Sequence, residues 1–138
     1  MANEALVSTI KQIMAIAKTG DADGANARYA ELFASDAFGS YSPEDRRQAL
    51  KLFILAKQKG GAPAPSFIET HRAAIAPLTS LVDEHDDPAD YEMLGVCYVL
   101  TGEEAVAATM FRAGLDRERT RDPESDLCGR LMKRFSAI

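Results

Sequence analysis

The chain of 138 residues has few of the residues on which most catalytic and metal sites depend. It contains two histidines and two cysteines, and neither cysteine belongs to a CxxC pair. It also lacks a P-loop, a GxGxxG fingerprint, a GxSxG elbow, an HExxH motif and the spacing of an EF-hand loop. We therefore expect no metal, no cofactor and no enzymatic activity.

Long apolar runs are also missing. No run approaches the roughly 20 residues that a membrane-spanning helix needs, and the first four residues lack the basic region and apolar core of a signal peptide. We expect a cytoplasmic protein without a membrane partner. In that compartment Cys97 and Cys128 are expected to be reduced and partly buried, although a disulfide between their two helices is also compatible with the sequence.

Basic residues are absent from the middle of the chain. Residues 73–111 contain no Lys or Arg and eight Asp or Glu, whereas both flanking segments have a slight excess of basic residues. Nucleic-acid binding needs a basic surface that meets the phosphates. The seven basic residues from Arg112 onward are interleaved with acidic ones, as on a solvent-exposed helix face. We therefore expect no nucleic-acid partner.

What the sequence does contain is helical periodicity from end to end. Ser42-Pro43 and Asp87-Pro88 each place a capping side chain before a proline that fits the first position of a helix. Pro77 should kink or split the helix that contains it, and Asp122-Pro123 repeats the start signal. Residues 36–41 are expected to be a connection with Phe38 against the core. The seven expected helices cover residues 3–18, 24–35, 43–58, 66–84, 88–100, 103–121 and 123–135.

One segment of the chain, residues 88–123, carries a spaced set of aromatic, apolar and small residues, namely Tyr91, Leu94, Gly95, Tyr98, Gly102, Ala107 and Phe111. In this pattern the segment resembles a tetratricopeptide repeat, a helix–turn–helix unit of 34 residues. Gly114 stands where alanine is usual, and Pro123 lies a few residues late. The resemblance implies a single all-α domain over residues 1–138. Its helices would stack as antiparallel hairpins in a right-handed solenoid, and the final helix would cap the last hairpin.

The resemblance also implies a function. In such proteins the first helix of each pair lines a concave surface that binds a peptide or a partner helix. The residues expected to bind the partner are Arg46, Arg47, Lys51, Ala89, Glu92, Val96 and Val99. The last four occupy the groove-facing places of the matching repeat, and the first three are assigned by analogous helical spacing. The expected function is that of an adaptor, scaffold or chaperone-like module.

Two other classes of function fit the sequence. The terminal helix, with Leu127, Leu131 and Phe135 at four-residue steps, is suited to exchange between copies of a self-assembling structural protein. An effector or metal site is conceivable where His85 lies in an acidic run. Capping of the helix that begins at Pro88 accounts for the aspartates before it, and Arg130, Lys133 and Arg134 are expected on the outer face of the last helix.

Overall fold

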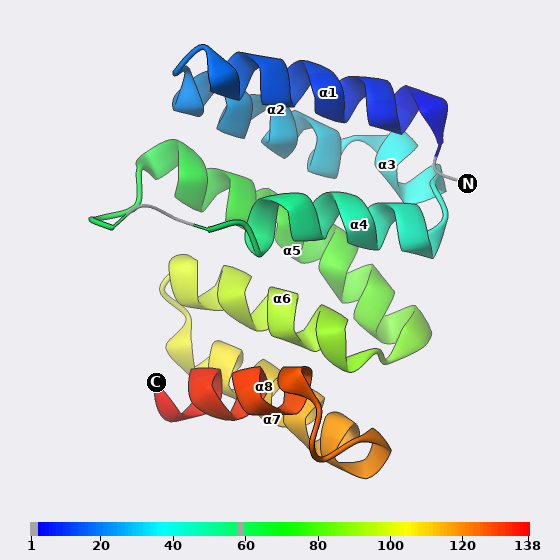
Figure 1. Cartoon of the computed structure of the whole chain (residues 1–138), viewed down its shortest axis with the longest axis vertical. Helices are drawn as coiled ribbons and strands as arrows, with labels where there is room; N and C mark the ends of the chain where they lie inside the picture. Colours follow the sequence, from blue (N-terminus) through cyan, green and yellow to red (C-terminus); the bar gives the residue numbers. More distant parts are fainter. Residues whose placement is uncertain (1–2, 58–59) are drawn as a thin grey trace. The chain divides into compact units, whose positions relative to one another are not determined.

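A computed structural model of the chain describes residues 3–57 and 60–138, and every regular element in these residues is an α-helix (Figure 1). The all-α class predicted from the sequence is confirmed. The described helices are α1 (Glu4–Lys18), α2 (Ala22–Ala34), α3 (Asp36–Ser40), α4 (Pro43–Ile54), α5 (Pro65–His85), α6 (Pro88–Leu100), α7 (Glu104–Arg121) and α8 (Asp126–Ser136).

Short polar side chains determine where most of these helices begin. The Ser42 hydroxyl accepts a hydrogen bond from the Asp45 N–H at the start of α4, and the Asp87 carboxylate accepts one from Ala89 at the start of α6. These side chains satisfy backbone donors that have no partner within the helix. Pro43 and Pro88 occupy the first turn. At the end of α6, Gly102 adopts a positive φ of 83°, as expected for a glycine that ends a helix.

Three boundaries differ from the sequence prediction, and the helix that contains Pro77 is not split. Residues 36–40 form the short helix α3, which Ser35 caps, although Phe38 is buried as expected. Helix α4 ends at Ile54, before the expected end near Gln58, and Gln58 and Lys59 lie outside the described residues. Helix α5 continues through Pro77 without a split. Helix α8 starts at Asp126, because the Ser125 side chain caps it, and not directly after Asp122-Pro123.

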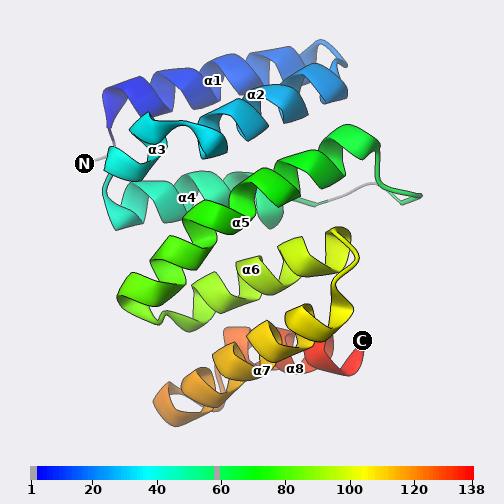
Figure 2. The same ribbon diagram turned by 180° about the vertical axis from the view of Figure 1, so that it is seen from behind.

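The chain divides into two compact units, the first ending at Pro77 and the second running from Leu78 to Ile138. The single domain expected over residues 1–138 stays a prediction. In the first unit, α1 and α4 lie on one side, while α2 and the part of α5 before Pro77 lie on the other (Figures 1 and 2). A cluster of rings fills the space between them. The rings in contact are those of Tyr29, Phe33, Phe38, Phe53, Phe67 and His71.

In the second unit, α6 packs on α7 and α7 packs on α8. Two glycines permit the close approach of α6 and α7. A Cβ at Gly95 would lie 2.4 Å from the Phe111 ring, and a Cβ at Gly114 would lie 2.9 Å from the Cβ of Tyr91. Both distances are too short for real side chains, so these positions require glycine. The hairpin of α6 and α7 is therefore closely packed.

Candidate functional site

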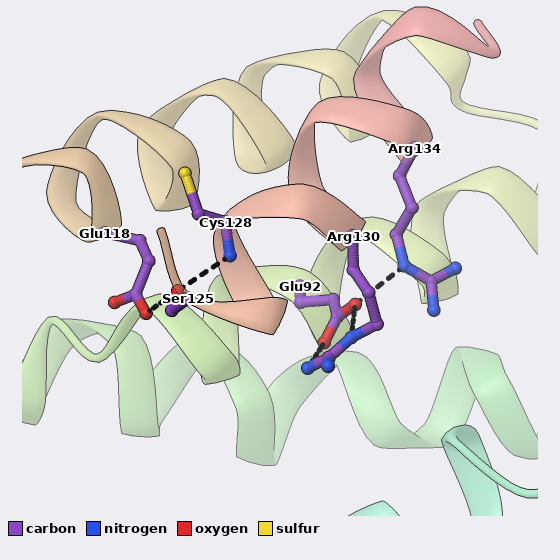
Figure 3. Close-up of polar contacts among 6 residues, drawn as sticks. All are labelled: Glu92, Glu118, Ser125, Cys128, Arg130 and Arg134. Atoms are coloured by element: carbon purple, nitrogen blue, oxygen red, sulfur yellow. Dashed lines mark hydrogen bonds and ion pairs between the residues drawn. The ribbon is translucent and has the colours of Figure 1, made fainter. Parts of the chain in front are cut away.

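A buried carboxylate on α6 binds two arginines from α8. Glu92 has 0% of its surface exposed. Arg130 donates two hydrogen bonds to it, from Nε to Oε2 at 3.0 Å and from Nη2 to Oε1 at 3.2 Å, and Arg134 donates a third from Nε to Oε2 at 2.8 Å (Figure 3). The hydrogen bonds that Arg130 donates to Glu92 raise the pKa of Arg130. A buried charge is tolerated only when it is paired in this way.

The two arginines lie on the inward face of α8. They follow Leu127 by three and seven residues, and Leu131 follows it by four, so all four side chains share one helix face. Leu127 and Leu131 are buried in a cluster with Phe111 and Leu115 of α7. The expectation that Arg130 and Arg134 point only to solvent is therefore wrong, although much of each side chain remains exposed.

A second buried carboxylate positions the start of α8. The Ser125 hydroxyl donates to Oε2 of Glu118 at 2.6 Å and accepts a hydrogen bond from the Cys128 N–H at 3.0 Å (Figure 3). Arg121 lies 2.8 Å from the other oxygen of Glu118, as an ion pair that lacks hydrogen-bond geometry. Glu118 is only 2% exposed. The α8 helix is thus attached at both ends of its buried face by a carboxylate of the α6–α7 hairpin.

The four groove residues expected on α6 have different surroundings. Glu92 is covered by the arginines of α8, and Ala89 and Val96 are partly buried against the apolar cluster that includes Leu127 and Leu131. Only Val99, near the end of α6, is substantially exposed. On this face of α6, Glu92 therefore already binds α8, while Ala89 and Val96 pack against a cluster that residues of α7 and α8 form together.

An open apolar groove lies in the first unit, between α1 and α4. It has a volume of about 160 Å³. Its lining residues are Leu6, Val7, Ile10, Lys11, Asp45, Gln48, Ala49 and Leu52. Apolar side chains predominate, and Lys11, Asp45 and Gln48 add polar groups. Leu52 is 37% exposed, so part of the apolar surface of α4 is accessible along this groove. A groove of this kind is suited to apolar side chains of a partner.

The three basic residues expected to bind the partner lie on α4. Arg46 is only 7% exposed, so it belongs to the interior of the unit and is not available to a partner in this structure. Arg47 and Lys51 are partly exposed. Neither lines the groove, which is formed by Asp45, Gln48 and Leu52 of the same helix.

The acidic connector before α6 forms a structural junction. Asp86 has a positive φ of 52°, and its Oδ1 accepts hydrogen bonds from Arg117 Nε at 2.7 Å and from the Tyr91 hydroxyl at 2.6 Å. These bonds lower the pKa of Asp86. The Arg117 guanidinium also lies 4.7 Å from the centre of the Tyr91 ring. Among residues 3–57 and 60–138, no group of three or more His, Cys, Asp or Glu side chains is arranged to hold a metal ion.

Both cysteines are free and buried. Burial raises the pKa of Cys97 to about 12, so this thiol carries no nucleophilic thiolate near neutral pH. In the described part of the chain, no helix is both long and apolar enough to cross a membrane.

Comparison with known proteins identifies no relative, because no protein-family model, curated protein or solved structure matches the chain. The function must therefore be argued from the residues alone. The sequence indicated Glu92 as a groove residue that binds a partner protein, which stays a prediction, and it did not indicate the pairing of Glu92 with Arg130 and Arg134. Their position on the same helix face as Leu127 and Leu131 was the signal that could have identified them.

Proposed function

We propose that this chain is a cytoplasmic, non-enzymatic protein–protein interaction module that binds an amphipathic helix of a partner protein in the groove between α1 and α4. The supporting observation is the groove itself, which is open and lined mainly by apolar side chains of both helices. An amphipathic helix offers apolar residues at three- and four-residue spacing that match such a groove.

The proposal includes a fold of the tetratricopeptide type. Its support is the match of residues 88–123 to the repeat pattern, together with the close packing of α6 on α7 at Gly95 and Gly114. In proteins of that type the first helices of successive pairs lie side by side and form the binding surface. Residues of both α1 and α4 line the groove in the first unit, which supports this part of the proposal.

A display library of helical peptides, selected on the full-length protein, tests the proposal. We expect the selected peptides to share an apolar stripe at helical spacing. We expect them to bind Leu52→Glu at least about tenfold more weakly, because the substitution removes apolar contact and places a charge in the groove.

Val106→Glu is the matched control, because Val106 on α7 has the same exposure as Leu52, 37%. It should leave peptide binding unchanged. Two results would exclude the α1–α4 groove as the binding site. In one, the selected peptides lose affinity equally for Leu52→Glu and Val106→Glu. In the other, the library yields no peptide that binds wild type more tightly than Leu52→Glu.

A further inference from the structure

The α6–α7 face of the second unit has the properties of a second helix-binding site. We propose that this face recognises a basic amphipathic helix of another protein, and that α8 is a releasable latch that occupies the site until such a helix displaces it. This inference concerns a different unit from the α1–α4 groove and does not depend on it.

The present occupant defines the chemistry of the ligand. Helix α8 places two leucines, Leu127 and Leu131, in the apolar cluster of α7 and two arginines on Glu92. A carboxylate that accepts three hydrogen bonds from two guanidinium groups favours a ligand with arginine at both positions. The partner helix should therefore carry leucine at positions i and i+4 and arginine at i+3 and i+7.

The site is built largely without α8. Phe111 of α7 lies against α6 at Gly95, and Tyr91 of α6 lies against α7 at Gly114. The α6–α7 hairpin is also joined to the segment before it through Asp86 and Arg117. Because these contacts involve no residue of α8, the receiving face should keep its shape when α8 leaves.

The attachment of α8 has two features of a releasable element. Gly129 lies in the interior of α8, yet a Cβ there would meet nothing within 4 Å. Packing does not require this glycine, and glycine is among the residues least favourable to a helix. In addition, α8 is attached partly through the ion pairs of the buried Glu92 carboxylate, and replacing a buried pair by apolar packing of the same volume is often neutral or stabilising.

The test measures binding of a labelled peptide, residues 122–138 of this chain, to the full-length protein by fluorescence anisotropy. Wild type should bind weakly, because its own α8 competes. Arg134→Gln removes one of the three bonds to Glu92 and weakens the latch, so it should bind the peptide at least about tenfold more tightly. Gly129→Ala strengthens the latch and should bind about three- to fivefold more weakly than wild type.

Lys133→Gln is the matched control. It removes the same charge from the same helix, but Lys133 is exposed and forms none of the bonds to Glu92. It should bind the peptide like wild type. A peptide with both arginines replaced by glutamine should bind Arg134→Gln at least about tenfold more weakly than the native peptide.

Three results would overturn the proposal. They are equal affinities of Arg134→Gln and Lys133→Gln, tighter binding by Gly129→Ala than by wild type, and absence of binding to every variant. Circular dichroism shows whether Arg134→Gln remains folded. If it does not, Gly129→Ala still decides the question, because an exposed alanine in a helix does not disrupt the fold.

Discussion

The pairing of Glu92 with Arg130 and Arg134 predicts that removing the carboxylate and removing the arginines destabilise the docking of α8 to different extents. The side chain of Glu92 is 1% exposed, whereas those of Arg130 and Arg134 are 48% and 35% exposed. When the carboxylate is removed, the arginines can turn to water. When the arginines are removed, a charge remains buried without a partner. Loss of the arginines should therefore cost more than loss of the glutamate.

The expected magnitudes follow from this difference. Glu92→Gln keeps an acceptor and should reduce the free energy that holds α8 in place by about 1–2 kcal/mol. The double variant Arg130→Met with Arg134→Met should reduce it by about 3–5 kcal/mol, the usual cost of a buried charge that has lost its partner. Adding Glu92→Met to that double variant should restore stability to within about 1 kcal/mol of wild type, because no charge is then buried.

Native-state hydrogen exchange of the α8 amides measures these free energies directly. The amides of α1 serve as an internal control, since they lie in the other unit and should not change. If Glu92→Gln accelerated exchange in α8 as much as the double arginine variant does, the carboxylate would not be the costly member of the pair. The account of its burial would then be wrong.

Three further predictions concern packing, capping and pH. Gly95→Ala should lower the free energy of unfolding by about 1–3 kcal/mol, because its Cβ would overlap the Phe111 ring, and urea titration would show a smaller effect if the ring moved aside freely. Ser125→Ala should cost about 2–3 kcal/mol, because it removes both the α8 cap and the hydrogen bond to the buried Glu118 carboxylate, and the loss should appear as faster exchange in that helix. Burial lowers the pKa of His71, whose Nδ1 lies 2.8 Å from the Phe67 carbonyl oxygen, so wild-type stability should begin to fall as the pH drops below about 6.5. His71→Leu should remove this first part of the loss and leave the part at lower pH that carboxylates such as Asp86 cause. An unchanged onset would exclude His71 as its source.

Much of the fold was predictable because its signals are local. The Ser42-Pro43 and Asp87-Pro88 pairs mark the starts of α4 and α6 correctly, since a cap acts on donors only two or three residues away. The five-residue helix α3 was not predictable from periodicity, because it is little more than one turn long. The start of α8 was misplaced because Asp122-Pro123 has the same local chemistry as the true starts.

The candidate site depended on contacts that no local signal contains. Glu92 and Arg130 are 38 residues apart in the sequence, and only the packing of α8 on the hairpin brings them together. Leu52 of α4 likewise borders a groove whose other wall is α1, and no signal within the α4 sequence identifies that neighbour. Periodicity identifies a helix face, but the partner of that face depends on tertiary packing.

Glu92 also determines which additional helical hairpins could dock on the α6–α7 hairpin in an engineered, longer protein. Helical hairpins are modular, and a longer protein can be made by grafting another hairpin in the place that α8 occupies. A graft whose first helix is apolar on its inner face would bury the Glu92 carboxylate without a partner and fail to dock. A graft with two arginines four residues apart should dock, because it can pair with this carboxylate. A single acidic side chain would therefore select the helices that can pack on the α6–α7 hairpin.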